Sequence, residues 1–152
     1  MTAELPLLSP RRSEYQFGGN MKSFVWAAGA AILCAGSVSA SAADFSFSFD
    51  WGALKKCTSG NPNTVSNPRF GLRNVPPGTA TIQFRMVDLA VPGYPHGVGK
   101  VKYSGGSSIE PGAFKYQSPC PPGGRHPYQW TATALDAGGK KLATAKAQKQ
   151  YP

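Results

Sequence analysis

The sequence is short of acidic residues, histidines and cysteines, and it has no long run of apolar residues. Its 152 residues include 7 Asp or Glu against 16 Lys or Arg, with 2 histidines and 3 cysteines. The main apolar run, Phe24–Cys34, is shorter than the roughly 20 residues that a membrane-spanning helix needs. The cysteines and histidines lack the C-x-x-C or H-x-x-x-H spacing of many redox and metal sites. We therefore expect no transmembrane anchor, no metal and no cofactor.

The excess of basic residues gives the chain a formal net charge of +9. Such a balance invites a nucleic-acid interpretation. The basic residues are scattered, however, and they form no dense block and no recognisable nucleic-acid module. We expect loose attraction to anionic surfaces or ligands, and no specific binding of nucleic acid.

The N-terminal region has the features of an export signal. Lys22 gives it a positively charged start, the apolar run follows, and Ala40-Ser41-Ala42 fits the small-x-small pattern of a cleavage site. This arrangement predicts a signal peptide at 21–43 and a periplasmic or secreted protein. A buried N-terminal helix is the alternative interpretation.

The same features divide the chain into three parts. If the signal peptide begins the protein, Met21 rather than Met1 is the start of translation. Residues 1–20 are then an upstream extension with no fold of their own, and residues 44–152 form a single domain. That length is ample for one β-sandwich or barrel core.

Two cysteines, Cys57 and Cys120, remain if the segment that carries Cys34 is removed. An even number of cysteines in an exported protein favours a disulfide. A redox pair or a thiolate metal site is the alternative.

Turn-forming residues interrupt the chain at short intervals, and the sequence holds 14 Pro and 18 Gly. Between the turns, apolar and polar residues alternate, and no stretch of helical period precedes residue 141. This pattern predicts an all-β fold with little helix, an antiparallel β-sandwich or barrel. The segment 141–147 is either alternating or weakly helical. Strands are expected at 45–51, 69–75, 79–88, 100–103, 113–117 and from 126 onward, with loops or turns at 52–68, 91–99 and 104–112.

The expected strand at 79–88 ends in a carboxylate that faces the core. Asp88 alternates in register with Ile82, Phe84 and Met86, so its side chain points inward. A lone buried charge costs several kcal/mol, and Asp88 therefore needs a partner.

The two histidines of the chain are the natural partners. A strand that starts at His126 places His126 and Tyr128 on the same face as Trp130. His96 lies in a Pro/Gly-rich loop after the strand that ends in Asp88. We expect these four polar residues to form one site.

The chemistry of this site favours a small anion. Protonated histidines and a tyrosine donate hydrogen bonds, and Arg125 adds a positive charge. Gly124 and neighbouring glycines allow backbone N–H groups to face an anion. Phosphate or a phosphate ester is the expected ligand, bound with micromolar-to-millimolar affinity. Two alternatives remain: the Asp88–His126 pair is a cap on the core, or the site belongs to a hydrolase that activates water with or without a metal.

Four motifs occur in order along the chain: V-P-P-G-T at 75–79, F-R-M-V-D at 84–88, P-C-P-P-G-G-R-H-P-Y at 119–128 and A-L-D at 134–136. Their order and spacing resemble the phosphatidylethanolamine-binding protein (PEBP) family, most closely its short bacterial, Raf-kinase-inhibitor-like members. The resemblance implies a β-sandwich of antiparallel sheets. It also implies binding of phospholipid head groups and, in some members, modulation of a kinase or protease partner.

The resemblance assigns site residues by position. Asp88 and Pro92 match the first aspartate and the proline of the family's D-P-D-x-P motif, and His126 and Tyr128 match its G-x-H-R-Y motif. His96 stands where the family has a histidine between these motifs. The resemblance therefore implies a ligand-binding site at these five residues.

The chain departs from the family pattern in three ways. Ala90 replaces the second carboxylate, Pro127 replaces the arginine that follows the histidine, and the aromatic residues that flank the middle histidine are missing. The loss of the second carboxylate implies a more cationic pocket and argues against a catalytic role that needs two carboxylates. We expect a non-enzymatic binding protein that acts in some settings as an inhibitor or modulator of a partner protein.

Overall fold

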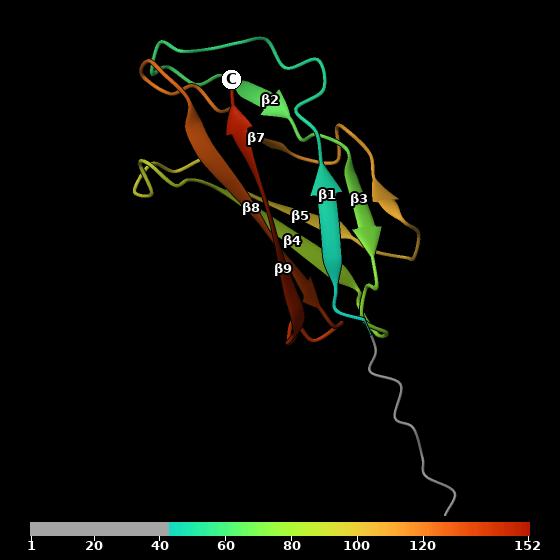
Figure 1. Ribbon diagram of the computed structural model, residues 1–152. Coiled ribbons are helices and arrows are strands. Elements are labelled where there is room, and N and C mark those ends of the chain that lie inside the picture. Colours follow the sequence, from blue (N-terminus) through green and yellow to red (C-terminus); the bar gives the residue numbers. More distant parts are fainter. Residues whose placement is uncertain (1–42) are drawn as a thin grey trace, which may run out of the picture. The chain divides into compact units, whose positions relative to one another are not determined.

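The computed structural model describes residues 43–152, and these residues form an all-β domain without a helix (Figure 1). The predicted upstream extension and, apart from residue 43, the predicted signal peptide lie outside the described residues and stay predictions. Within residues 43–152, no helix is long and apolar enough to cross a membrane.

Within residues 43–152, nine strands make up three antiparallel sheets. The larger sheet has the order β5-β4-β8-β9, a second sheet has the order β1-β3-β6, and a two-stranded sheet joins β2 to β7. The strands are β1 (Ser46–Phe49), β2 (Thr64–Ser66), β3 (Phe70–Arg73), β4 (Thr81–Asp88), β5 (Val98–Lys102), β6 (Ser108–Ile109), β7 (Lys115–Gln117), β8 (His126–Leu135) and β9 (Lys141–Tyr151).

The register of β4 and β8 builds the inner face of the larger sheet. Phe84 lies opposite Ala132, Met86 opposite Trp130, and Asp88 opposite a tyrosine at the start of β8. Every second residue of both strands is buried, as the alternating sequence predicts. The polar ends of both strands therefore lie at the same edge of the core.

Aromatic rings hold the two main sheets together. Phe70 of β3 stacks on Phe84 of β4 with 4.2 Å between ring centroids, and it meets Trp130 of β8 edge-on at 5.2 Å. Phe47 of β1 also contacts Phe84, at 6.0 Å. Full burial of one such ring contributes about 2 to 3 kcal/mol, so this layer accounts for much of the domain's cohesion. The predicted β-sandwich is confirmed.

The strand predictions differ from the structure at the short elements. The expected loops 52–68 and 104–112 were wrong in part, because they contain β2 and β6, which have three and two residues. Strands this short show no periodicity in the sequence, and they form because they pair with strands that are distant along the chain. The strand expected at 100–103 begins two residues earlier, at Val98. The ambiguous segment after residue 140 is a strand, because β9 pairs with β8 along its whole length.

The predicted disulfide between Cys57 and Cys120 is present. It joins the loop after β1 to the loop before β8, two segments 63 residues apart. An isolated bridge between Ser59 and Pro122 and a 3.0 Å hydrogen bond from the Gly123 N–H to a carbonyl of the first loop lie beside it. The two loops therefore form one wall at the end of the sandwich.

Candidate functional site

The buried end of β4 holds an ion pair. Asp88 is 4% exposed, and its Oδ2 lies 2.7 Å from Nδ1 of His126. His126 lies diagonally across the β4–β8 ladder, within reach of a side chain at the strand end. The other carboxylate oxygen accepts hydrogen bonds from the backbone N–H groups of Ala90 and Val91, at 2.9 and 3.3 Å. The chain turns directly after β4 and thereby supplies these donors.

These contacts keep Asp88 charged. Burial by itself raises the pKa of the Asp88 carboxyl, but the hydrogen bonds from His126, the Tyr128 hydroxyl and the Ala90 N–H outweigh burial. The pKa of Asp88 consequently lies below its ordinary value. The end of β4 therefore presents a carboxylate at neutral pH.

His96 is buried, with 3% of its surface exposed, although its sequence context allowed an exposed position. Its Nδ1 donates to the backbone carbonyl of Gln117 at 2.9 Å, and the Gln117 N–H donates to the His96 carbonyl at 2.9 Å. Burial lowers the pKa of the His96 ring, against the opposing effects of the Gln117 carbonyl and the negative charge of Asp88. The ring is therefore neutral at pH 7, with its hydrogen on Nδ1.

Tyr128 completes the polar group. It is 1% exposed, and the ring of His96 meets it edge-on at 5.5 Å. Burial, followed by the hydrogen bond to Asp88 and the negative charge there, raises the pKa of the Tyr128 hydroxyl. The hydroxyl therefore stays protonated and able to donate.

A cavity of about 200 Å³ lies against these side chains. The structure brings Asp88, His96 and Tyr128 together in its lining, while His126 reaches Asp88 without lining the cavity. The complete lining is Gly60, Pro62, Asp88, Val91, Tyr94, His96, Cys120, Pro122 and Tyr128.

Three residues expected at the site lie outside this lining. Pro92, Gly124 and Arg125 are all exposed. Their role in ligand binding stays a prediction. The cavity is accordingly less cationic than the sequence suggested, since its charged group is a carboxylate.

Sequence reasoning missed the loop residues that close the cavity. Gly60 and Pro62 come from the loop after β1, and Pro122 comes from the loop before β8. The available signal was the cysteine pair, because a disulfide between Cys57 and Cys120 brings exactly these two loops together.

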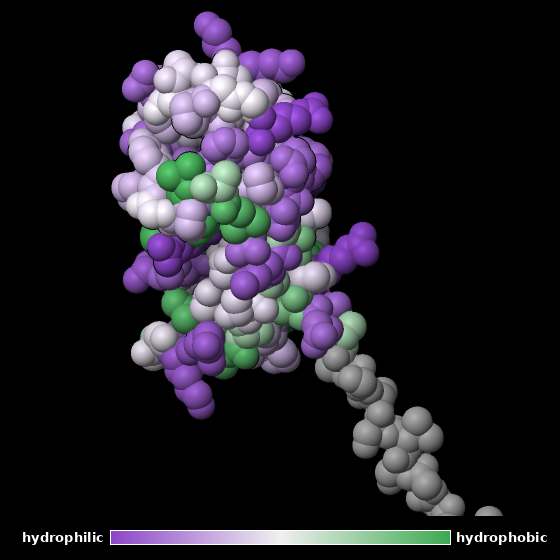
Figure 2. Space-filling model, turned by 60° about the vertical axis from the view of Figure 1, so that its left-hand side comes forward, coloured by the Kyte–Doolittle hydropathy of each residue, from purple (hydrophilic) through white to green (hydrophobic). Residues whose placement is uncertain are grey.

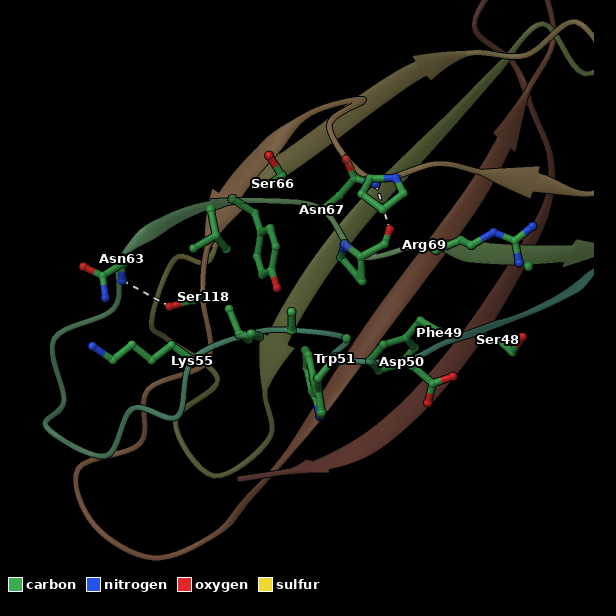
Figure 3. Close-up of a pocket in the computed structure, with 18 residues that line it drawn as sticks. Ser48, Phe49, Asp50, Trp51, Lys55, Asn63, Ser66, Asn67, Arg69 and Ser118 are labelled. Atoms are coloured by element: carbon green, nitrogen blue, oxygen red, sulfur yellow. Dashed lines mark hydrogen bonds between the residues drawn. The ribbon is translucent and has the colours of Figure 1, made fainter.

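A larger cavity of about 670 Å³ opens where the chain segments beyond the last β1–β3 pair diverge (Figure 3). Several of its polar side chains are already committed to internal partners. Trp51 donates to the Gln150 carbonyl at 2.8 Å, and Asn67 donates to the Pro68 carbonyl at 2.8 Å. Arg69 is paired with a glutamate at 3.0 Å. The smaller cavity, where an ionised carboxylate, an imidazole and a hydroxyl converge, is therefore the better candidate site.

Within the described part of the chain, no three His, Cys, Asp or Glu side chains are grouped as they would be to hold a metal ion.

Comparisons with known proteins identify the fold. No protein-family model matches the sequence, and no curated protein does either. Among solved structures, E. coli YbcL, described as a member of the mammalian PEBP family, superposes with a TM-score of 0.51 and 18% identity. The match covers 72% of this chain and 98% of YbcL. The domain has a PEBP-like fold.

A second solved structure is a Chlamydia trachomatis protein described as a PEBP homolog, with 16% identity and a TM-score of 0.49 over 72% of this chain and 97% of that one. The PEBP-like fold confirms, at the level of architecture, the resemblance carried by the sequence motifs. At such low identity the likeness concerns the fold, and the roles of individual residues in the PEBP-like domain rest on the geometry described above.

Proposed function

We propose that the PEBP-like domain is a non-enzymatic binding protein whose 200 Å³ cavity takes a small phosphate-bearing ligand, such as a phospholipid head group. The observation that supports the proposal is the convergence of Asp88, His96 and Tyr128 on one cavity lined otherwise by apolar residues and glycine. Ligand sites combine an apolar lining with a few placed polar groups in this way. The volume suits a head group better than a larger molecule.

The charges of the cavity favour a ligand that carries a cationic amine beside its phosphate. The carboxylate of Asp88 attracts the amine, and the Tyr128 hydroxyl, whose hydrogen is donated to Asp88, can accept from the same amine through its oxygen. A bare anion would lack these contacts and be repelled by the carboxylate. Phosphorylethanolamine supplies the amine, so we expect it to bind more tightly than inorganic phosphate.

Export and a protein partner are part of the same proposal. The Cys57–Cys120 disulfide is compatible with an oxidising compartment such as the periplasm or the exterior. An exported head-group-binding protein could act on a partner as an inhibitor or modulator. Pull-down of the mature domain's partners from periplasmic extract, with an Asp88→Ala variant as control, would test this part.

Isothermal titration with phosphorylethanolamine tests the cavity. Tyr128→Phe removes the hydroxyl oxygen that can accept from the ligand amine and keeps the ring, so the affinity should fall about ten-fold, the effect of losing a hydrogen bond to a charged group. Tyr103→Phe is the matched control, because the Tyr103 hydroxyl donates to the Gly106 carbonyl away from the cavity lining. Equal heats for both variants and the unaltered protein would place binding elsewhere.

A hydrolase remains the second candidate because of one specific observation. A carboxylate that holds an imidazole at 2.7 Å is the arrangement that orients a general base. Incubation with p-nitrophenyl phosphate separates the two functions. Turnover that disappears in Asp88→Asn would favour the hydrolase, and the absence of turnover in a protein that binds phosphorylethanolamine would favour the binding protein.

A further inference from the structure

The outer face of the larger sheet carries positive charge without negative charge. Because side chains alternate along a strand, the residues between the buried ones point to solvent. Four of these are basic and exposed, and we call them the basic face: Arg85, Lys100, Lys102 and Lys146.

The strand register places these residues close together. Lys100 lies opposite Gln83, two residues along the strands from the row that joins Val98, Arg85, Thr131 and Lys146 across the sheet. With neighbouring strands about 4.8 Å apart, the row spans about 14 Å. None of the outward positions of β4, β8 and β9 is Asp or Glu. In the described residues, no member of the basic face takes part in an ion pair.

One end of the same face is apolar. Val98 is 52% exposed and lies opposite Arg85. Leu89, which is also exposed, extends the pairing of β4 with β8 by one residue, because its N–H donates to the Pro127 carbonyl. Val91 and Tyr94 are also exposed in the loop that follows. This loop, at the left of Figure 1, comes forward in Figure 2, where a compact hydrophobic patch lies among hydrophilic residues.

We propose that the basic face, with the exposed apolar residues at its end, docks on the surface of an anionic lipid bilayer. Juxtaposed basic and aliphatic side chains are the combination by which peripheral proteins bind such surfaces, through attraction to lipid phosphates and shallow insertion of apolar groups. Neither of the two cavities described above is lined by the basic face. Single-stranded nucleic acid fits less well, because bases stack on several aromatic side chains, and Tyr94 is the one aromatic residue among the exposed apolar residues named above. The inference goes beyond the proposed function and does not depend on ligand binding in the cavity.

Sedimentation of the full chain with vesicles tests the proposal. Vesicles of equal parts phosphatidylcholine and phosphatidylglycerol should bind the protein, and pure phosphatidylcholine vesicles should not. Each basic residue near an anionic surface strengthens binding about five-fold, so Lys100→Gln, Lys102→Gln and Lys146→Gln together should weaken binding about 100-fold. Binding should also fall as salt is added, which needs no variant.

The matched control removes the same charge elsewhere. The control triple variant carries Lys55→Gln, Lys56→Gln and Lys115→Gln. These three lysines lie outside the larger sheet, so their replacement should weaken vesicle binding far less. Both triple variants keep the same N-terminal residues, whose own contribution therefore cancels. Circular dichroism confirms that each variant is folded.

Three outcomes would overturn the proposal. The first is no binding of the protein to the anionic vesicles, and the second is an equal loss of vesicle binding in both triple variants. The third is unchanged vesicle binding in the first triple variant together with loss of its binding to a single-stranded oligonucleotide. The last result would assign the face to nucleic acid. Loss of phosphorylethanolamine binding in Tyr128→Phe with intact vesicle binding would concern the cavity and leave the docking face supported.

Discussion

The Asp88 carboxylate is held by donors from two distant parts of the chain, the His126 ring and the backbone directly after β4. Asp88→Ala leaves these donors without an acceptor, so the free energy of unfolding should fall by about 2 to 3 kcal/mol. Asp88→Asn should lose less, because its amide oxygen still accepts from the backbone. Urea unfolding at neutral pH measures both. Losses below about 0.5 kcal/mol for Asp88→Ala would show that the ion pair contributes little.

Acidification should destabilise the domain in two steps. The pKa of His96 lies below its ordinary value of 6.5 in the folded state, so below pH 6.5 the unfolded chain binds a proton that the folded chain does not. The pKa of Asp88 is also depressed, so its stabilisation is present above 3.8 and disappears as the pH falls through the lower folded value.

Calorimetric melting temperatures between about pH 7 and about pH 5 test the first step. His96→Gln cannot titrate, so its melting temperature should change less than that of the unaltered protein over this range. Parallel curves for the two proteins would show that the folded state protonates His96 as easily as the unfolded chain does.

At the scale of elements, β5 packs through a glycine against Phe114, the residue that precedes β7. A Cβ at Gly99 would overlap the ring of Phe114, so Gly99→Ala forces a shift of packed groups and should cost about 1 to 3 kcal/mol. Gly93→Ala is the control, because a Cβ there meets no atom within 4 Å. Equal unfolding midpoints in urea for the two variants would show that the ring moves aside freely.

The predictability of an element followed from its length and from the strictness of its alternation. The inward faces of β4 and β8 could be predicted residue by residue, including Asp88 and Tyr128, because eight and ten residues alternate without a break. The strands β2 and β6 could not, because two or three residues carry no period. The sequence placed His96 at the site but left its burial open, since the hydrogen bond from its ring to the Gln117 carbonyl, 21 residues away, holds it inside.

At the scale of the whole molecule, the disulfide links segments that the sheets do not join. Its 63-residue separation corresponds to about 4 kcal/mol of chain-entropy stabilisation. Replacing Cys57 and Cys120 by serine, in a Cys34→Ser background that prevents thiol exchange, should lower the free energy of unfolding by up to this amount. Urea unfolding measures the loss, and an unchanged midpoint would mean that the bridged loops are already held by their other contacts.

The cavity is likewise a property of the whole molecule. Its lining comes from three loops and two strand ends between residues 60 and 128, so the pattern within any one segment could not reveal it. The sequence motifs identified the polar members on β4 and β8, and the tertiary fold added the apolar ones.

The hydrogen bond from His96 Nδ1 to the Gln117 carbonyl also determines whether binding of the proposed ligand takes up a proton from the buffer. The neutral ring offers a lone pair at Nε2, which can accept from a ligand amine directly. A ligand oxygen can accept a hydrogen bond from Nε2 only after Nε2 has taken up a proton from the buffer. The measured heat of binding then varies with the ionisation enthalpy of the buffer. Titrations in two buffers of different ionisation enthalpy would thus reveal which end of a zwitterionic ligand faces the imidazole.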